Sequence, residues 1–388
     1  MQKLSKLMLA AVAAIALATP AMAWDFGVTG TATAGWNMAT EKDNSTDTTT
    51  TSSMRVSSAG SNLKLASGHT DGDKTVSFSY TIDYDGNLDE TMAASGSTKV
   101  GDWTASGGVA YNIGQTDDGT SQQTGEDSTS VTVTDGTMTI VLGDAAHLSS
   151  QSKGSGGSSG GRVCMDTSTC DYGVGAYVGG FHGVSLGYKV SDTMNVTVAL
   201  QQSGDDNDSM GSTINIQDAE AATHDVDGMG LSLTGSAGEI TYGLTFANAK
   251  TKDPTGGSST LTTSWSTLGL GVGMTMGATS PFFSYGSASA TGSSTSNKYD
   301  VTGLELGATH KLGDDTIVFD YTTVTTKTTT AGTAGEPETW TGIELGYGTT
   351  VGPASLDIGY GTRARAQTDG GSDGYSSTDL DVTMVYSF

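Results

Sequence analysis

Short segments in which apolar and polar residues alternate recur along this sequence and continue to its last residue. In the final segment Leu380, Val382, Met384, Tyr386 and Phe388 alternate with residues that are almost all polar. A period of two residues places alternate side chains on opposite faces of a β-strand. After residue 23 no apolar run reaches the about 20 residues of a membrane-spanning helix. The pattern therefore predicts an all-β protein and excludes a helical membrane topology.

Alternation alone also fits a soluble antiparallel sheet, whose apolar face covers a core. Here only 35% of the residues are hydrophobic, 56 of the 388 are glycine, and the polar faces carry Gly, Thr, Ser and carboxylates. That composition favours the inverse arrangement, with apolar side chains facing lipid and polar side chains around a water-filled lumen. Strands in lipid must close on themselves, because every backbone polar group needs a partner there. The prediction is an antiparallel up-and-down transmembrane β-barrel.

The connections between the predicted strands alternate between short turns and long polar segments from about residue 184 to the end. We count sixteen strands between residues 26 and 388, among them 98–112 and 129–143. The acidic stretch 113–128 is long for a turn, so a count of eighteen also stays open. Trp36, Trp103 and Trp340 fall near predicted strand ends, where aromatic side chains form interfacial girdles.

Residues 1–23 have the features of a cleaved secretory signal peptide: Lys3 and Lys6, a short apolar run, and small residues at the end. The barrel domain then comprises residues 24–388. The chain has 17 Lys+Arg against 42 Asp+Glu, a formal charge of -25, so nucleic acid is not an expected partner. The excess of acids predicts a modest preference for cations near a pore.

Three segments resemble the general diffusion porins of Gram-negative bacteria: 26–30 (Phe-Gly-Val-Thr-Gly), 136–144, and the terminal strand ending in Phe388. The resemblance covers the whole chain after residue 23 in layout, but only these segments in motif. It implies a homotrimer of sixteen-stranded barrels in the outer membrane, in contact with lipid and lipopolysaccharide. A long third loop would fold into the lumen, and Phe388 would be the membrane-insertion signal for the assembly machinery. The implied function is passive diffusion of small hydrophilic solutes and ions through a water-filled channel.

In that family, acids of the third loop face basic residues of the wall across a pore constriction. The corresponding candidates here are Asp144, Asp166 and Asp171 on the loop side, and Arg55, Lys64, Lys189, Arg363 and Arg365 on the wall. For any one of them, an ordinary solvated lumen charge explains the residue equally well.

Cys164 and Cys170 lie in the same loop region, and an even cysteine count in an exported protein predicts a disulfide. A metal site is the weaker alternative, because no histidine is near and the spacing of zinc ligands is absent. The acidic loops do not match the calcium-loop template. We expect neither a metal nor a cofactor.

Two other functions stay open at this point. An outer-membrane enzyme would need a nucleophile and a base, yet the five histidines lie in no recognisable catalytic motif, so we expect no enzyme. A Gly/Ser/Thr-rich surface adhesin, or a structural outer-membrane protein, would share the composition but would not conduct ions.

Overall fold

The structure is a computed structural model that describes residues 24–43, 48–57, 61–83, 89–115, 122–145, 147–148, 181–201, 225–252, 263–292, 298–330, 332–365 and 374–388. Its regular elements are all β-strands, joined in one antiparallel sheet. Among the described residues, no helix is long and apolar enough to cross a membrane.

The strands of the first half are β1 (Asp25–Asp43), β2 (Thr48–Ser57), β3 (Asn62–Asp71), β4 (Lys74–Asp83), β5 (Asp89–Val100), β6 (Trp103–Gln115), β7 (Gln122–Thr134), β8 (Met138–Ala145), β9 (Phe181–Ser191) and β10 (Met194–Gln201). Those of the second half are β11 (Asp225–Ala237), β12 (Ile240–Lys252), β13 (Thr263–Met274), β14 (Thr279–Gly292), β15 (Lys298–Leu312), β16 (Asp315–Thr330), β17 (Thr333–Ala334), β18 (Glu338–Val351), β19 (Ala354–Arg365) and β20 (Tyr375–Ser387).

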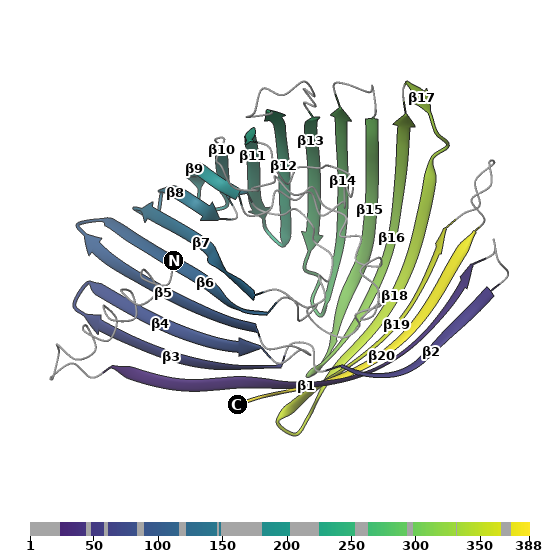
Figure 1. The fold of residues 1–388 in the computed structure, drawn as a ribbon, viewed down its shortest axis with the longest axis horizontal. Helices are drawn as coiled ribbons and strands as arrows, with labels where there is room; N and C mark the ends of the chain where they lie inside the picture. The colour runs from purple at the N-terminus through teal and green to yellow at the C-terminus, as the bar shows by residue number, and fades with distance from the viewer. Residues whose placement is uncertain are drawn as a thin grey trace.

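Apart from β2 and β17, each strand pairs with the strand before it and the strand after it in the wall, and β20 returns to pair with β1, so the sheet closes into a barrel (Figure 1). β2 and β3 lie on the same side of β1, β2 along residues 35–43 and β3 along residues 25–31, and they share one place in the wall. β17 has only two residues and pairs with the end of β16, beside β18. The wall therefore has 18 strands.

The predicted count of sixteen is two strands too low, because two predicted strands each contain a turn. The segment predicted at 98–112 reverses at Gly101, and the one predicted at 129–143 reverses at Gly136, with φ angles of 63° and 85°. This left-handed conformation suits glycine, which has no Cβ. The carboxylate of Asp135 stabilises the second turn by accepting the N–H groups of Thr137 and Met138 at 2.8 and 2.7 Å. These hydrogen bonds lower the pKa of Asp135, chiefly the one from Met138.

With these two turns in place, short and long connections alternate along the whole barrel. The turns at one end have two to four residues, at 72–73, 101–102, 135–137, 192–193, 238–239, 275–278, 313–314 and 352–353. At the other end, the connection that follows β8 is the longest, and it joins Ala145 to Phe181. It is the fourth connection at that end, not the third as the sixteen-strand count had it.

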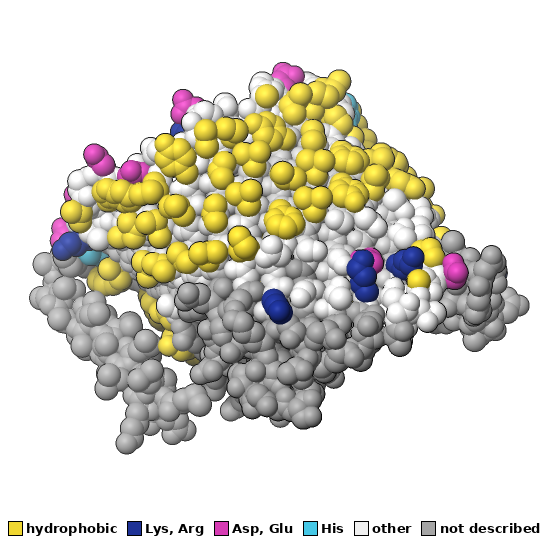
Figure 2. Space-filling view, turned by 90° about the horizontal axis from the view of Figure 1, so that it is seen from above, with side chains coloured by type: hydrophobic (Ala, Val, Ile, Leu, Met, Phe, Trp, Pro, Cys, Tyr) yellow, Lys and Arg dark blue, Asp and Glu magenta, His cyan; other side chains and the backbone are white. Residues whose placement is uncertain are grey.

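The outer surface of the barrel is apolar. Large apolar side chains project from it on five strands between β13 and β19, and each is at least 37% exposed: Leu270, Leu306, Phe319, Leu345 and Tyr360. Hydrophobic side chains form a broad band across the face in Figure 2, with acidic side chains along one margin. A soluble protein rarely exposes so large a continuous apolar patch. Strands of this length with an apolar outer band are suited to a lipid bilayer.

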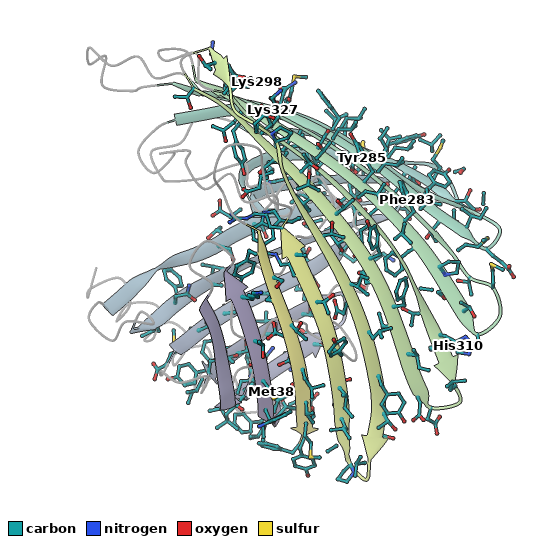
Figure 3. All side chains as sticks on the ribbon, turned by 90° about the vertical axis from the view of Figure 1, so that its right-hand side faces the viewer. Met38, Phe283, Tyr285, Lys298, His310 and Lys327 are labelled. Carbon is teal, nitrogen blue, oxygen red and sulfur yellow. The ribbon has the colours of Figure 1, made fainter. Side chains whose placement is uncertain are left out.

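The inner surface carries many polar side chains, among them the buried Asn37, Ser232, Thr245, Asp379 and Asp381. Along β14, Phe282, Ser284 and Ala288 are buried on the lumen side, while Phe283 and Tyr285 project outward (Figure 3). Figure 3 also separates the two ends of the barrel: Lys298 and Lys327 lie at the end with the longer connections, and His310 lies at the turn end. The predicted inversion of polarity is therefore confirmed.

The last residue of the chain lies against the first strand. The backbone N–H and C=O of Phe388 both pair with Gly30, at 3.0 and 2.8 Å, and the ring of Phe388 covers this glycine. A Cβ atom at Gly30 would lie 2.5 Å from Cζ of Phe388, whereas one at Gly27 would meet nothing within 4 Å. The ring of Phe388 also stacks on Tyr386, with the centroids 6.0 Å apart.

We predict that Gly30→Ala reduces the yield of folded barrel, because the added methyl group displaces Phe388 from β1. The matched control is Gly27→Ala, which adds the same methyl group to the same strand in open space. The fraction that migrates as folded protein in an unheated gel measures the effect. Equal yields for the two variants would contradict this account of the closure.

The apolar band gives a second prediction. Leu345→Arg should destabilise the barrel by about 2–4 kcal/mol, the cost of a cation at the lipid-facing midplane. Thr322→Arg places the same side chain on the lumen side of the adjacent strand β16 and should cost much less. Urea-dependent refolding into phospholipid vesicles measures both. A larger loss for Thr322→Arg would mean that the inner and outer faces have been exchanged.

Candidate functional site on the lumen wall

Acidic side chains cluster on one arc of the inner wall, from β15 to β20. They are Glu305, Asp320, Glu344, Asp357, Asp379 and Asp381, and each alternates along its strand with an outward apolar residue. Cross-strand pairing joins them into a band: Asp320 lies opposite Glu344, and Asp379 and Asp381 lie opposite Gly361 and Gly359. Because Gly359 and Gly361 have no side chains, they leave space beside the carboxyl groups of Asp381 and Asp379.

Asp381 is held by a neighbour on the wall. Asn37 of β1 donates a hydrogen bond to Oδ1 of Asp381 over 2.5 Å, across the ladder that closes the barrel. Asn37, Asp379 and Asp381 are all buried within the lumen side. Asp379 and Asp381 are therefore buried acids of the inner wall and not exposed surface groups.

A smaller basic cluster lies on the same arc, towards the end with the longer connections. The guanidinium carbon of Arg363 lies 3.7 Å from the centre of the Trp340 ring, and that of Arg365 lies 5.1 Å away. Arg365 also donates to Glu338, with Nη1 2.6 Å from Oε1. Tyr375 meets Trp340 edge to face, with the centroids 5.6 Å apart. Both arginines thus lie against an aromatic surface on the inner wall.

Trp340 corrects one expectation from the sequence. It shares a face with Glu338 and Glu344, opposite to the outward Ile343 and Leu345, so it points into the lumen and not into an interfacial girdle. The sequence pattern contains this information, because Trp340 keeps the period of the polar positions of its strand. We expected an interfacial position only because the side chain of Trp340 is aromatic.

Of the predicted constriction residues whose side chains the structure describes, Lys64, Asp144 and Lys189 lie apart on the wall, and Arg363 and Arg365 lie together. Lys64 points into the lumen from β3, opposite Thr29 and Thr81. Lys189 lies at the turn end, where its ammonium group is 2.9 Å from Oδ1 of Asp192. This hydrogen bond and the positive charge of Lys189 lower the pKa of Asp192.

Asp144 is the second-last residue of β8, and its Oδ2 accepts the backbone N–H of Thr129 on β7 over 3.4 Å. This hydrogen bond joins it to the neighbouring wall strand. The backbone of Arg55 belongs to β2, opposite Asn37 of β1. Its side chain, together with Asp166, Asp171, Cys164 and Cys170, lies outside the residues that the structure describes.

The long connection after β8 begins by entering the lumen. Nδ1 of the buried His147 lies 2.9 Å from Oγ of Ser185, and Nε2 lies 2.8 Å from the carbonyl oxygen of Gly143. The next residue, Leu148, packs against the inward Ala199 and Ala247 of β10 and β12. The start of this connection is therefore fixed on the inner wall. This agrees with the expectation that the long loop folds into the lumen.

The sequence analysis did not single out Glu305, Asp320, Glu344, Asp379 or Asp381 as site residues. Each was visible as a polar position in an alternating segment, but the chain has 42 acids and the pattern does not rank them. Among the described residues, no group of three His, Cys, Asp or Glu side chains is arranged to hold a metal ion.

No protein-family model matches this sequence, and no curated protein matches it. Solved structures do. DcaP, an outer membrane channel of Acinetobacter baumannii, is 15% identical with a TM-score of 0.56, over 94% of this chain and 97% of DcaP. The anion-selective porin from Comamonas acidovorans is 13% identical with a TM-score of 0.52, over 94% of this chain and 100% of that porin.

This chain has the porin fold. The trimer form of OmpT, an outer membrane protein of Vibrio cholerae, aligns equally well, with 12% identity, a TM-score of 0.52, and coverage of 94% of this chain and 100% of OmpT. At such identities the likeness concerns the path of the backbone, so the residues on the lumen wall must be interpreted from their own geometry.

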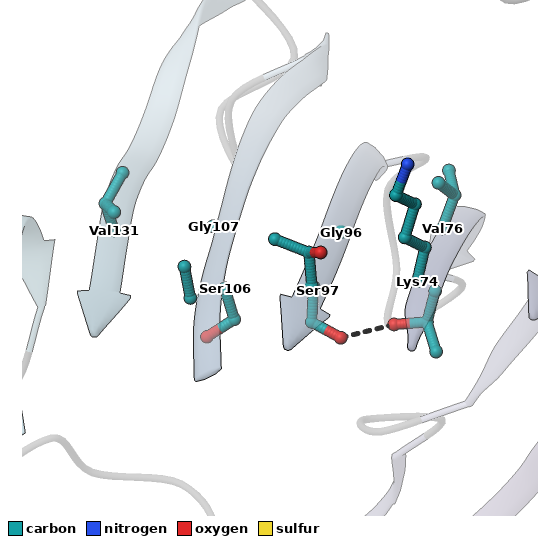
Figure 4. Close-up of a pocket in the computed structure, with 10 residues that line it drawn as sticks. Lys74, Val76, Gly96, Ser97, Ser106, Gly107 and Val131 are labelled. Carbon is teal, nitrogen blue, oxygen red and sulfur yellow. Dashed lines mark hydrogen bonds between the residues drawn. The ribbon is translucent and has the colours of Figure 1, made fainter. Parts of the chain in front are cut away.

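The barrel of this porin fold also has a shallow depression of about 410 Å³ on its outer side (Figure 4). The residues that line it include Lys74, Val76, Gly96, Gly107 and Val131. The hydroxyl groups of Thr75 and Ser97, 2.5 Å apart, lie on the lumen side of the same strands. Gly96 and Gly107 are paired across β5 and β6, so two missing side chains leave the space, which lies on other strands than the acidic band of β15–β20.

We predict that Trp340→Leu destabilises the barrel by about 1–2 kcal/mol, because Arg363 loses the aromatic face on which it lies. Trp340→Phe keeps an aromatic face and should retain part of that stability. Urea-dependent refolding of the two variants provides the comparison. If Phe and Leu were equivalent at this position, the stacking of the arginine would be of no energetic importance.

Proposed function

We propose that this protein is an outer-membrane porin, a water-filled channel through which small hydrophilic solutes and ions diffuse passively. The observation that carries the proposal is the inverted polarity of a closed barrel: an apolar outer band and a charged inner wall. An 18-stranded barrel is wide enough to leave an aqueous lumen. No chemical step is required of such a protein.

We further propose a modest preference for cations. The acidic band on β15–β20 contributes more charges than the arginine pair beside it, and Glu338 already neutralises part of the positive charge of Arg365. Fixed negative charge in a narrow aqueous path raises the local concentration of cations. The related fold from Comamonas acidovorans is named anion-selective, so the lumen charges, and not the fold, must decide the preference.

Assembly and location complete the proposal. A homotrimer is supported by the trimer form of OmpT, which has the same fold. The apolar band would contact lipid and lipopolysaccharide in the outer membrane of a Gram-negative bacterium. Residues 1–23 would be removed on export, and Phe388, placed on the closing strand, would be recognised by the assembly machinery.

The constriction remains as proposed from the sequence. Asp144, Asp166 and Asp171 would line the loop side, a disulfide between Cys164 and Cys170 would stabilise that loop, and the wall would contribute Arg55, Lys64, Arg363 and Arg365. The position of Lys189 at the turn end favours a role at the rim for this residue.

Planar bilayer recordings test the function. Purified protein should produce stepwise conductance increases in groups of three, and a salt gradient should give a reversal potential of the sign expected for cation preference. The double variant Glu344→Gln/Asp379→Asn should lower that preference, because it removes two charges from the acidic band. Bilayers that stay silent would rule out the channel function.

The matched control is Asp73→Asn/Asp314→Asn, which removes two acids from the turns at the rim. Salt screens these exposed charges, so the reversal potential should change little at physiological ionic strength. If the rim variant had the larger effect, selectivity would arise at the channel mouth and not on the inner wall.

A further inference from the structure

Two acids of the lumen wall, Glu305 on β15 and Asp320 on β16, are hydrogen-bonded to each other. In the ladder between these strands, Glu305 lies opposite Thr322 and Asp320 lies opposite Gly307. The two carboxyl groups are therefore diagonal neighbours on the inner face, within reach of each other. Gly307 allows this approach, because a side chain there would lie between them.

The surroundings of the pair exclude water. Glu305 and Asp320 are each only 7% exposed. Gly307 is covered by Phe282, because a Cβ at this glycine would lie 2.6 Å from Cζ of that ring. Val318, two residues before Asp320 on the same face, is 2% exposed. Two full negative charges in such a place would carry a large desolvation penalty.

The hydrogen bond itself requires a proton. An ionised carboxylate can only accept hydrogen bonds, so one of two carboxyl groups that bond to each other must carry an O–H. The other described interaction of Asp320 is with the backbone N–H of Tyr321, and neither interaction brings a positive charge. Oδ1 of Asp320 is buried without a hydrogen-bond partner among the described residues, which fits a carboxyl group that is not fully ionised.

We propose that Glu305 and Asp320 share one proton and count as a single negative charge in the lumen. The titratable group that faces the pair from the next strand is Glu344, directly opposite Asp320, and the proposal assigns the shared proton to Glu305 and Asp320 alone. The effective charge of the acidic band is therefore one unit smaller than the number of its carboxyl groups.

This inference rests on the proposed channel function and gives it a test by substitution. Glu305→Gln or Asp320→Asn removes one carboxyl group, but the amide N–H replaces the shared O–H and the remaining carboxylate keeps the charge. Each single variant should leave the reversal potential in a salt gradient unchanged. The double variant Glu305→Gln/Asp320→Asn should shift it as far as Glu344→Gln, the control that removes one unshared charge. If each single variant shifted the potential as far as Glu344→Gln, the pair would be doubly ionised and the proposal wrong.

A second measurement does not depend on conduction. The infrared spectrum of the folded protein near neutral pH should contain the C=O stretch of a protonated carboxyl group, and this band should disappear in each single variant. A wild-type spectrum without the band would overturn the proton sharing even if the channel conducts. A silent bilayer together with the band would instead refute the channel function and leave the shared proton in place.

Discussion

Backbone hydrogen bonding is the constraint on which the rest of this structure depends. In hydrocarbon an unpaired N–H or C=O group has no water to replace its partner, so a sheet must have no edge. The ladder between β1 and β20 meets that demand with thirteen paired positions, from Thr31 opposite Ser387 to Asp43 opposite Tyr375. Once the ring is closed, the period of two residues assigns every side chain to lipid or to the lumen.

Closure also determines what the lumen can contain. Polar groups that would be costly in a soluble core are tolerated here, because they face each other and a water-filled path. The inner wall nevertheless includes dry places, such as the pair Glu305 and Asp320 beneath Phe282, and the arginines against Trp340. Charge in this barrel is therefore shaped by local burial and by neighbours, and it cannot be obtained by adding up the residues on one face.

The sequence predicted the architecture because alternation is a local property that survives without knowledge of contacts. It missed two strands because the turns at Gly101 and Gly136 interrupt segments whose alternation resumes at once, and the acidic stretch near residue 120 was the one visible sign. The residues of the candidate site were harder to predict from the sequence. Arg363 and Arg365 could be recognised from their shared inward register, but the partnership of Glu305 with Asp320 depends on the register between strands, which no single segment encodes. The contact of Leu148 with Ala199 and Ala247 likewise joins residues far apart in the sequence, so the three-dimensional structure is needed to see it.

The ladders of the wall differ in length. β7 and β8 share only five paired positions, from Ser130 opposite Gly143 to Thr134 opposite Thr139, whereas β8 stays paired with β9 as far as Ala145. The chain that departs there is the one that carries His147 and Leu148 into the lumen. Among the described ladders between strands of the wall, the one between β7 and β8 is the shortest, and the ladder between β1 and β20 has thirteen paired positions. A pull on that segment would therefore separate β7 from β8 before it separated the first strand from the last.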